Sequence, residues 1–159
     1  MEMVKLVLAC ALLPLAASAA GFTLTIGPPV AAGAGAKVVK KSAAVFAVRL
    51  EECGELDTAQ VGGTAEGIVD GQRKSGALTI AAAGSPGVYV VSLADSENHN
   101  DNPGVWLVSL SASCGKAKAG AIVPMGPQGF LREGTKVLPR SATKADIDFA
   151  LKALEKPSR

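Results

Sequence analysis

The chain carries one eight-residue pattern twice, as Pro86-Gly87-Val88-Tyr89-Val90-Val91-Ser92-Leu93 and as Pro103-Gly104-Val105-Trp106-Leu107-Val108-Ser109-Leu110. Each copy is a turn followed by a run of apolar, β-branched and aromatic residues, which is typical of a strand. Because apolar residues fill nearly every position, we expect both strands to be central in a sheet and covered on both faces. The polar segment 95–102 joins the copies, so the pattern predicts two antiparallel neighbours connected by an exposed loop.

Strand patterns also precede this pair. Residues 22–26 alternate apolar and polar side chains, which predicts an edge strand. Residues 44–50 predict a core strand. Its side chains divide between two faces, with Phe46, Val48 and Leu50 on one face and Arg49 and Glu51 on the other.

Two short segments, 64–69 and 77–82, predict a hairpin. Asp70-Gly71 lies between them, and Gly accepts positive φ without a Cβ clash, so Asp-Gly is a hairpin signal. The polar residues 72–75 predict a long exposed tip instead of a two-residue turn. Residues 119–123 predict a last strand, which Pro124 ends.

The period of the pattern changes near the C-terminus. Apolar residues recur at helical spacing at Ile147, Ala150, Leu151 and Leu154. Thr143 can cap the start of this helix, and an acidic residue at position 146 suits the positive end of the helix dipole. The sequence therefore predicts an amphipathic helix over about 144–155.

The first twenty residues have the pattern of a cleavable signal peptide. Lys5 and the amino terminus give a weakly positive start, and an apolar run follows over 6–17. Small residues end the run, so we expect cleavage near Ala19 and Ala20, just before Ala20 or Gly21. The run is shorter than the roughly 20 residues of a spanning helix, and we expect no membrane-spanning segment in the mature chain.

Composition and cysteines agree with export. The 159-residue chain has a net charge of +2 with scattered charges, which argues against nucleic acid as a partner. Removal of the signal peptide removes Cys10 and leaves Cys53 and Cys114. Two cysteines in an exported chain predict a disulfide, which would consume both thiols.

Short strands, turn signals and the late Pro-Gly-Val-Tyr strand resemble an immunoglobulin-like or fibronectin-type β-sandwich over residues 22–123. The resemblance implies a mainly β, antiparallel sandwich in which Tyr89 makes the corner contact. Trp106 departs from the pattern, because immunoglobulin domains place their tryptophan well before the second cysteine. Cys53 also has the alternation parity of Arg49, on the face opposite Phe46. A likeness of fold implies no function.

Two groups of polar residues could carry chemistry. Asp95, Glu97, His99 and Asp101 could supply ligands to a metal ion such as calcium, zinc or copper, although a solvated loop has the same composition. A triad would have to use His99, the only histidine, and no serine lies in a Gly-x-Ser-x-Gly elbow. Ser109, Ser111 and Ser113 alternate along one strand and predict a polar, half-buried sheet surface.

These patterns divide the chain into a signal peptide (1–20), an N-terminal strand and Gly/Ala/Pro linker (21–43), a β-sandwich body (44–126) and a C-terminal extension (127–159). The interpretation is a secreted or periplasmic, non-catalytic β-sandwich that binds or scaffolds, with protein or cell-envelope components as partners. Two alternatives are a metal-binding module that uses loop 95–101 and a secreted enzyme of unassigned class. No catalytic residue or cofactor is assigned, apart from the metal ion of the first alternative.

Overall fold

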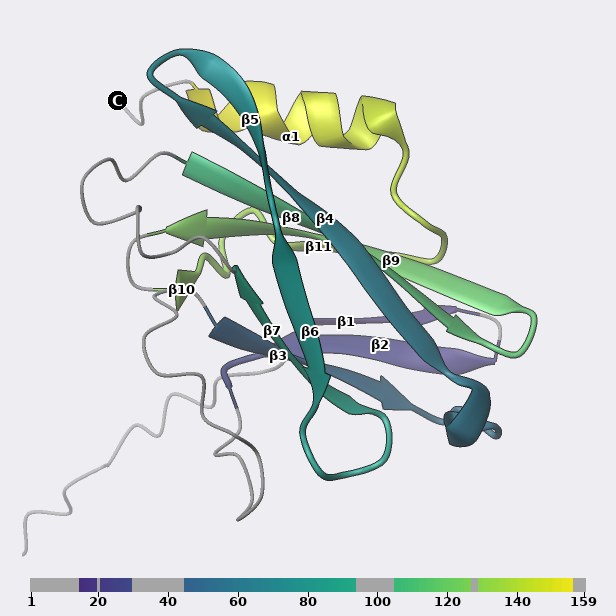
Figure 1. Ribbon diagram of the computed structural model, residues 1–159. Helices are drawn as coiled ribbons and strands as arrows, with labels where there is room; N and C mark the ends of the chain where they lie inside the picture. Colours follow the sequence, from purple (N-terminus) through teal and green to yellow (C-terminus); the bar gives the residue numbers. More distant parts are fainter. Residues whose placement is uncertain (1–14, 20, 30–44, 94–104, 127–128, 156–159) are drawn as a thin grey trace, which may run out of the picture.

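The chain folds into two antiparallel sheets that pack together, with one C-terminal helix (Figure 1). The computed structural model describes residues 15–19, 21–29, 45–93, 105–126 and 129–155. The first sheet has the spatial order β1 (Leu15–Ala19), β2 (Phe22–Gly27), β3 (Val45–Glu51), β7 (Val88–Leu93) and β6 (Leu78–Ala82). The predicted mainly β fold is confirmed.

The second sheet lies opposite the first. Its spatial order is β10 (Gly129–Phe130), β9 (Ala117–Gly126), β8 (Val105–Cys114), β4 (Gln60–Val69) and β5 (Gln72–Gly76), and β11 (Lys136–Leu138) also pairs with β9. A short 3-10 helix, η1 (Leu56–Thr58), precedes β4. No helix in the described ranges is long and apolar enough to cross a bilayer.

Alternating side chains from both sheets form one core. The buried face of β3 carries Phe46, Val48 and Leu50, as predicted, and Arg49 is exposed on the other face. The second sheet contributes alternate residues of β8 and β9. The largest side chains of this core that are almost fully buried include Phe22, Leu24, Ile26, Phe46, Val48, Val91, Leu93, Val108, Leu110 and Val123.

The two copies of the repeated pattern are central strands, but they are not neighbours. β7 lies between β3 and β6 in the first sheet, whereas β8 lies between β9 and β4 in the second. The predicted pairing is therefore wrong, because an apolar strand can be central in either sheet of a sandwich. The prediction that these strands are covered on both faces is correct only in part. On the outer face of β8, Leu107 is buried but Ser111 is exposed.

The predicted hairpin forms, but with a different partner and a tighter turn. Asp70 and Gly71 both have positive φ, 53° and 72°, so they form a two-residue turn of the I′ kind. β5 (Gln72–Gly76) therefore pairs with β4 where a long tip was expected. After Gly76 the chain passes into the first sheet, where β6 pairs with β7.

β9 runs past Pro124, the residue expected to end the strand over 119–123. The carbonyl oxygen of Pro124 accepts a hydrogen bond from the backbone N–H of Leu131 at 2.7 Å, so this side of Pro124 faces away from β8. In an antiparallel pair the N and C=O of one residue point to the same neighbour. The missing N–H of Pro124 therefore removes no hydrogen bond from the β8–β9 pair.

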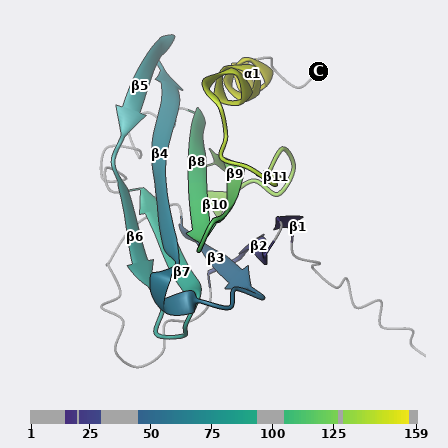
Figure 2. The same cartoon turned by 90° about the vertical axis from the view of Figure 1, so that its right-hand side faces the viewer.

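Helix α1 (Lys144–Glu155) covers part of the outer face of the second sheet (Figure 2). The predicted range is confirmed, and the helix packs its buried Leu151 with Leu107 and Ile122. At its start Thr143 and Asp146 cap each other: the Asp146 N–H donates to Thr143 Oγ1 at 3.3 Å, and the Thr143 N–H donates to Asp146 Oδ2 at 2.7 Å.

Cys53 and Cys114 form the predicted disulfide, with their Cα atoms 5.9 Å apart. The bond joins the chain just after β3 in the first sheet to the last residue of β8 in the second. The parity that placed Cys53 with Arg49 does not apply, because β3 ends at Glu51 and Glu52 has a left-handed φ of 62°. The turn at Glu52 interrupts the alternation, and the side chain of Cys53 is buried in the core.

The first strand lies within the predicted signal peptide. β1 pairs with β2 over Leu15–Ala19, and both expected cleavage points fall between these two strands. In the full chain β2 thus has neighbours on both sides. Cleavage at either point would leave β2 at the edge of the sheet, which is the position predicted for residues 22–26.

Trp106 packs against two glycines of the neighbouring strands. A Cβ atom at Gly67 would lie 2.6 Å from the indole ring, and one at Gly76 would lie 2.8 Å from it. Because Gly67 pairs directly with Trp106, the ring lies across β4 toward β5. Both positions therefore require glycine for the ring to remain where it is.

Replacement of Gly67 by alanine should lower the free energy of unfolding by about 1–3 kcal/mol, because the added methyl group overpacks the ring of Trp106. Urea unfolding followed by tryptophan fluorescence measures the change. Gly27→Ala is the matched control, since a Cβ there meets no atom within 4 Å. Equal midpoints for the two variants would contradict the packing described above.

Loss of the disulfide should lower the free energy of unfolding by about 4 kcal/mol, because the cysteines are 61 residues apart in the sequence and the open loop adds entropy to the unfolded chain. Denaturant unfolding of the oxidised protein and of Cys53→Ala/Cys114→Ala measures this. Alkylation without reductant should add no mass to the processed protein. A labelled Cys53 or Cys114 would show that the bond is absent.

The cap of α1 should make the helix sensitive to acid. The Arg140 guanidinium, with the hydroxyl and N–H of Thr143, holds the pKa of Asp146 well below its ordinary value of 3.8. A lowered folded-state pKa stabilises the protein above the unfolded pKa, and this contribution is lost as the pH falls below about 3.8.

Thermal unfolding of the wild type and of Asp146→Asn between pH 5 and pH 2 tests this linkage. The wild type should lose more stability over this range than Asp146→Asn does. Arg140→Gln should make this loss smaller than in the wild type, because it removes the main cause of the lowered pKa. The same pH dependence in all three proteins would be inconsistent with the cap.

Candidate functional site

The outer face of the second sheet has an apolar part and a polar part. Helix α1 covers the part around Leu107 and Ile122. Further along β8, the alternation places Ser109, Ser111 and Ser113 on the same face as Leu107. The strands thus present hydroxyl groups where the helix no longer covers the sheet.

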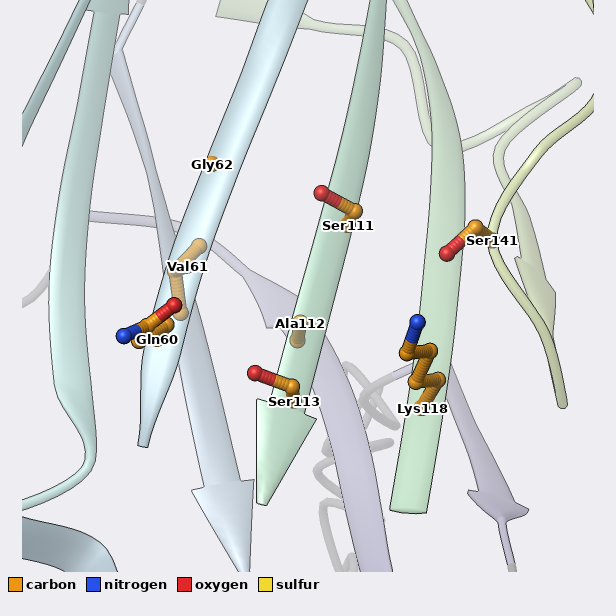
Figure 3. Close-up of a pocket in the computed structure, with 8 residues that line it drawn as sticks. All are labelled: Gln60, Val61, Gly62, Ser111, Ala112, Ser113, Lys118 and Ser141. Carbon is orange, nitrogen blue, oxygen red and sulfur yellow. The ribbon is translucent and has the colours of Figure 1, made fainter. Parts of the chain in front are cut away.

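Strand register brings other polar residues beside these serines. Ser113 lies between Gln60 on β4 and Lys118 on β9, and Ser111 lies between Gly62 and Gly120. Together they form a surface pocket of about 290 Å³ (Figure 3). We call it the serine pocket, and its lining residues are Gln60, Val61, Gly62, Ser111, Ala112, Ser113, Lys118 and Ser141.

Two glycines give the pocket its shape. Gly62 lies beside Ser111 and has no side chain. A Cβ atom there would lie 3.8 Å from Ser111 Oγ, which is an ordinary van der Waals contact. At Gly120 a Cβ would come within 2.6 Å of the carbonyl oxygen of Arg140. Gly120 therefore allows the segment before α1 to cross the sheet closely, which brings Ser141 to the rim.

The side chains approach the pocket from different sides. In Figure 3 Gln60 comes from β4 on one side, and the Lys118 amino group and the Ser141 hydroxyl lie on the opposite side. The hydroxyls of Ser111 and Ser113 lie between them and point toward β4.

Four of these polar side chains have no hydrogen-bonding or ionic partner within the described part of the fold. Among the described residues, the side chains of Gln60, Ser111, Ser113 and Lys118 make no hydrogen bond or ion pair with one another or with neighbours. Hydroxyl and amide groups both donate and accept hydrogen bonds, and an ammonium group donates only. The serine pocket therefore presents a set of free donors and acceptors, with one positive charge on the side of β9.

Two other basic residues of this sheet and of the segment before α1 form ion pairs. Arg73 contacts both Glu66 and Asp148, its Nη1 lying 2.7 Å from Asp148 Oδ1. Arg140 donates to both carboxylate oxygens of Asp146, at 2.6 and 3.1 Å. These pairs attach α1 to β5 and to the segment that precedes the helix, and they leave Lys118 as the charged residue of the pocket lining.

The structure brings together one set of the residues predicted from the sequence. Cys53 and Cys114 are joined, so their thiols supply neither a nucleophile nor a metal ligand. The predicted metal ligands Asp95, Glu97, His99 and Asp101 lie outside the described residues. Across the ranges that the structure does describe, no group of three or more His, Cys, Asp or Glu could hold a metal ion.

The sequence predicts the part of the site on β8 but not the residues that the other elements contribute. The alternating serines of β8 predict a polar sheet surface, and this is where the pocket lies. Gln60, Lys118 and Ser141 carry no local signal, because their approach depends on strand register and on the chain crossing over Gly120. The Gly-Gly pair at positions 62–63 in a strand is the one local sign of a close approach or a hollow.

Comparison with known proteins adds no relative. Neither protein-family models, nor curated protein sequences, nor solved structures give a match to this chain. The chemistry of the serine pocket therefore has to be interpreted from its own residues.

Proposed function

We propose that this protein is an exported, non-catalytic, immunoglobulin-like β-sandwich that binds a component of the cell envelope through the serine pocket. The observation that carries the proposal is the group of unpaired polar side chains around a hollow in a sheet. Small-ligand sites are concave and hold a few polar groups that fix the orientation of the ligand. A volume of about 290 Å³ lies at the small end of the range of ligand pockets, so the ligand should be a small molecule.

Strand order supports the immunoglobulin-like part of the proposal. In spatial order, β2-β3-β7-β6 occupy the positions of strands A-B-E-D, and β5-β4-β8-β9 those of C′-C-F-G. The disulfide then links the segment just after strand B to the end of strand F, the same two strands that the immunoglobulin disulfide joins. The Tyr89 hydroxyl lies 3.5 Å from the carbonyl oxygen of Ala59, 30 residues upstream, and Tyr89 is on the strand in position E. It therefore does not make the expected corner contact, which a tyrosine of strand F makes to the backbone a few residues before it.

Export is supported by two independent features. The first twenty residues have the charge, apolar run and small residues of a signal peptide. The disulfide closes a long loop and belongs to the oxidising compartments outside the cytoplasm.

The proposal is tested in two stages. Expression of the full chain in a bacterium should yield an exported protein whose first residue is Ala20 or Gly21, determined by N-terminal sequencing of the periplasmic and medium fractions. Intact protein with residue 1 retained in the cytoplasm would refute export.

Binding is then tested on the processed protein by two-dimensional NMR against a panel of envelope sugars, amino sugars and small acids. A ligand should shift the backbone amides of Gly62, Ser111 and Lys118. Gly62→Val fills the hollow and should abolish these shifts, whereas Gly27→Val, at an open position, should retain them. Unchanged binding by Gly62→Val, or shifts confined to other strands, would refute the serine pocket as the site.

A further inference from the structure

The lining of the serine pocket carries a single charge, which is positive. Lys118 is the charged member of its lining, and no carboxylate belongs to that lining. Glu66 lies on β4 with its side chain on the same face as that of Gln60, and it forms an ion pair with Arg73. In the described part of the chain, Lys118 has no acceptor of its own.

The arrangement of the lining separates an ionic end from a neutral end. Lys118 and Ser141 lie together on the side of β9, and Gln60 lies across the pocket on β4 (Figure 3). An ammonium and a hydroxyl on one side can both donate to the same oxyanion. The amide of Gln60 and the hydroxyls of Ser111 and Ser113 can both donate to and accept from neutral hydroxyl groups.

The remaining lining argues for polar recognition. Val61, Gly62 and Ala112 complete the pocket, and none of the lining residues is aromatic. A neutral sugar would therefore find no ring to stack on, and most of the affinity has to come from hydrogen bonds and charge. Hydrogen bonds to a charged group stabilise a complex more than neutral ones do.

We infer that the serine pocket binds a monosaccharide-sized acid, with the oxyanion held by Lys118 and Ser141 and the sugar hydroxyls by Gln60, Ser111 and Ser113. This inference rests on the proposed binding function and adds the ligand class. The oxyanion is a carboxylate, as in a uronic acid, or a phosphate, as in a sugar phosphate. Both would lie against Lys118 while the ring lies over Gly62.

Isothermal titration calorimetry of the processed protein with glucose, glucuronate, glucose 6-phosphate and inorganic phosphate tests the inference, because the first three share one ring. At low salt, glucuronate or glucose 6-phosphate should bind about tenfold or more tightly than glucose. Whichever acid binds tighter identifies the oxyanion. Added salt should reduce the difference, because it screens the exposed charge.

Variants locate the charge that matters. Lys118→Gln should lower the affinity for the acid to that for glucose, and Lys118→Arg should retain most of it. Lys74→Gln is the matched control, because it removes an equal charge from β5, outside the pocket lining. Circular dichroism of each variant shows whether the fold is retained.

The outcomes separate this inference from the proposed function. Equal affinities for glucose and the acids, or an unchanged affinity in Lys118→Gln, would overturn the oxyanion while leaving the serine pocket as a site. No binding of any of the four compounds also overturns the inference, whereas the broader NMR panel still tests the pocket. Phosphate that binds as tightly as glucose 6-phosphate would contradict the role of Gln60 and the serines. Wild-type binding by Gly62→Val would overturn both.

Discussion

The alternation of side chains along β8 is the constraint on which both faces of the second sheet depend. Trp106, Val108, Leu110 and Ala112 point into the sandwich and are buried. The residues between them face outward, and they change character along the strand from Leu107 to the serines. A shift of one residue in the pairing of β8 would expose the core residues and bury the serines. The register of β8 thus sets the positions of the core residues, of the surface that α1 covers and of the serine pocket.

Much of the fold follows from patterns that depend on few residues at a time. The period of two in residues 44–50 and the helical spacing of residues 147–154 predict elements that the structure contains. The errors concern relations between segments. The apolar strands 88–93 and 105–110 carry no information about which sheet each one joins. The polar residues after Asp70-Gly71 are typical of an exposed loop, so they predict a long tip where the chain makes a two-residue turn and pairs β5 with β4. Pairing is decided by the whole sandwich, which a local pattern does not contain.

The site was harder to predict than the fold for the same reason. Ser111 and Ser113 are visible as an alternating pair, but a polar edge of a strand is common on protein surfaces. What makes a pocket here is the absence of a side chain at Gly62 and the crossing of residues 140–142 over Gly120. Lys118 becomes a pocket residue only because β9 pairs with β8 in one register. Long-range geometry of this kind has no counterpart in composition or spacing.

The position of the disulfide has a consequence for the timing of maturation. Cys114 directly follows Ser113, so the covalent link to Cys53 holds the strand end that carries a hydroxyl of the serine pocket. In a reducing compartment this strand end would lack its tie to the first sheet, and the pocket would rest on noncovalent pairing alone. Oxidation outside the cytoplasm would then complete the fold and set the geometry of the binding groups in a single event. If the protein is exported as proposed, newly made chains would reach full binding strength only after they had crossed the membrane.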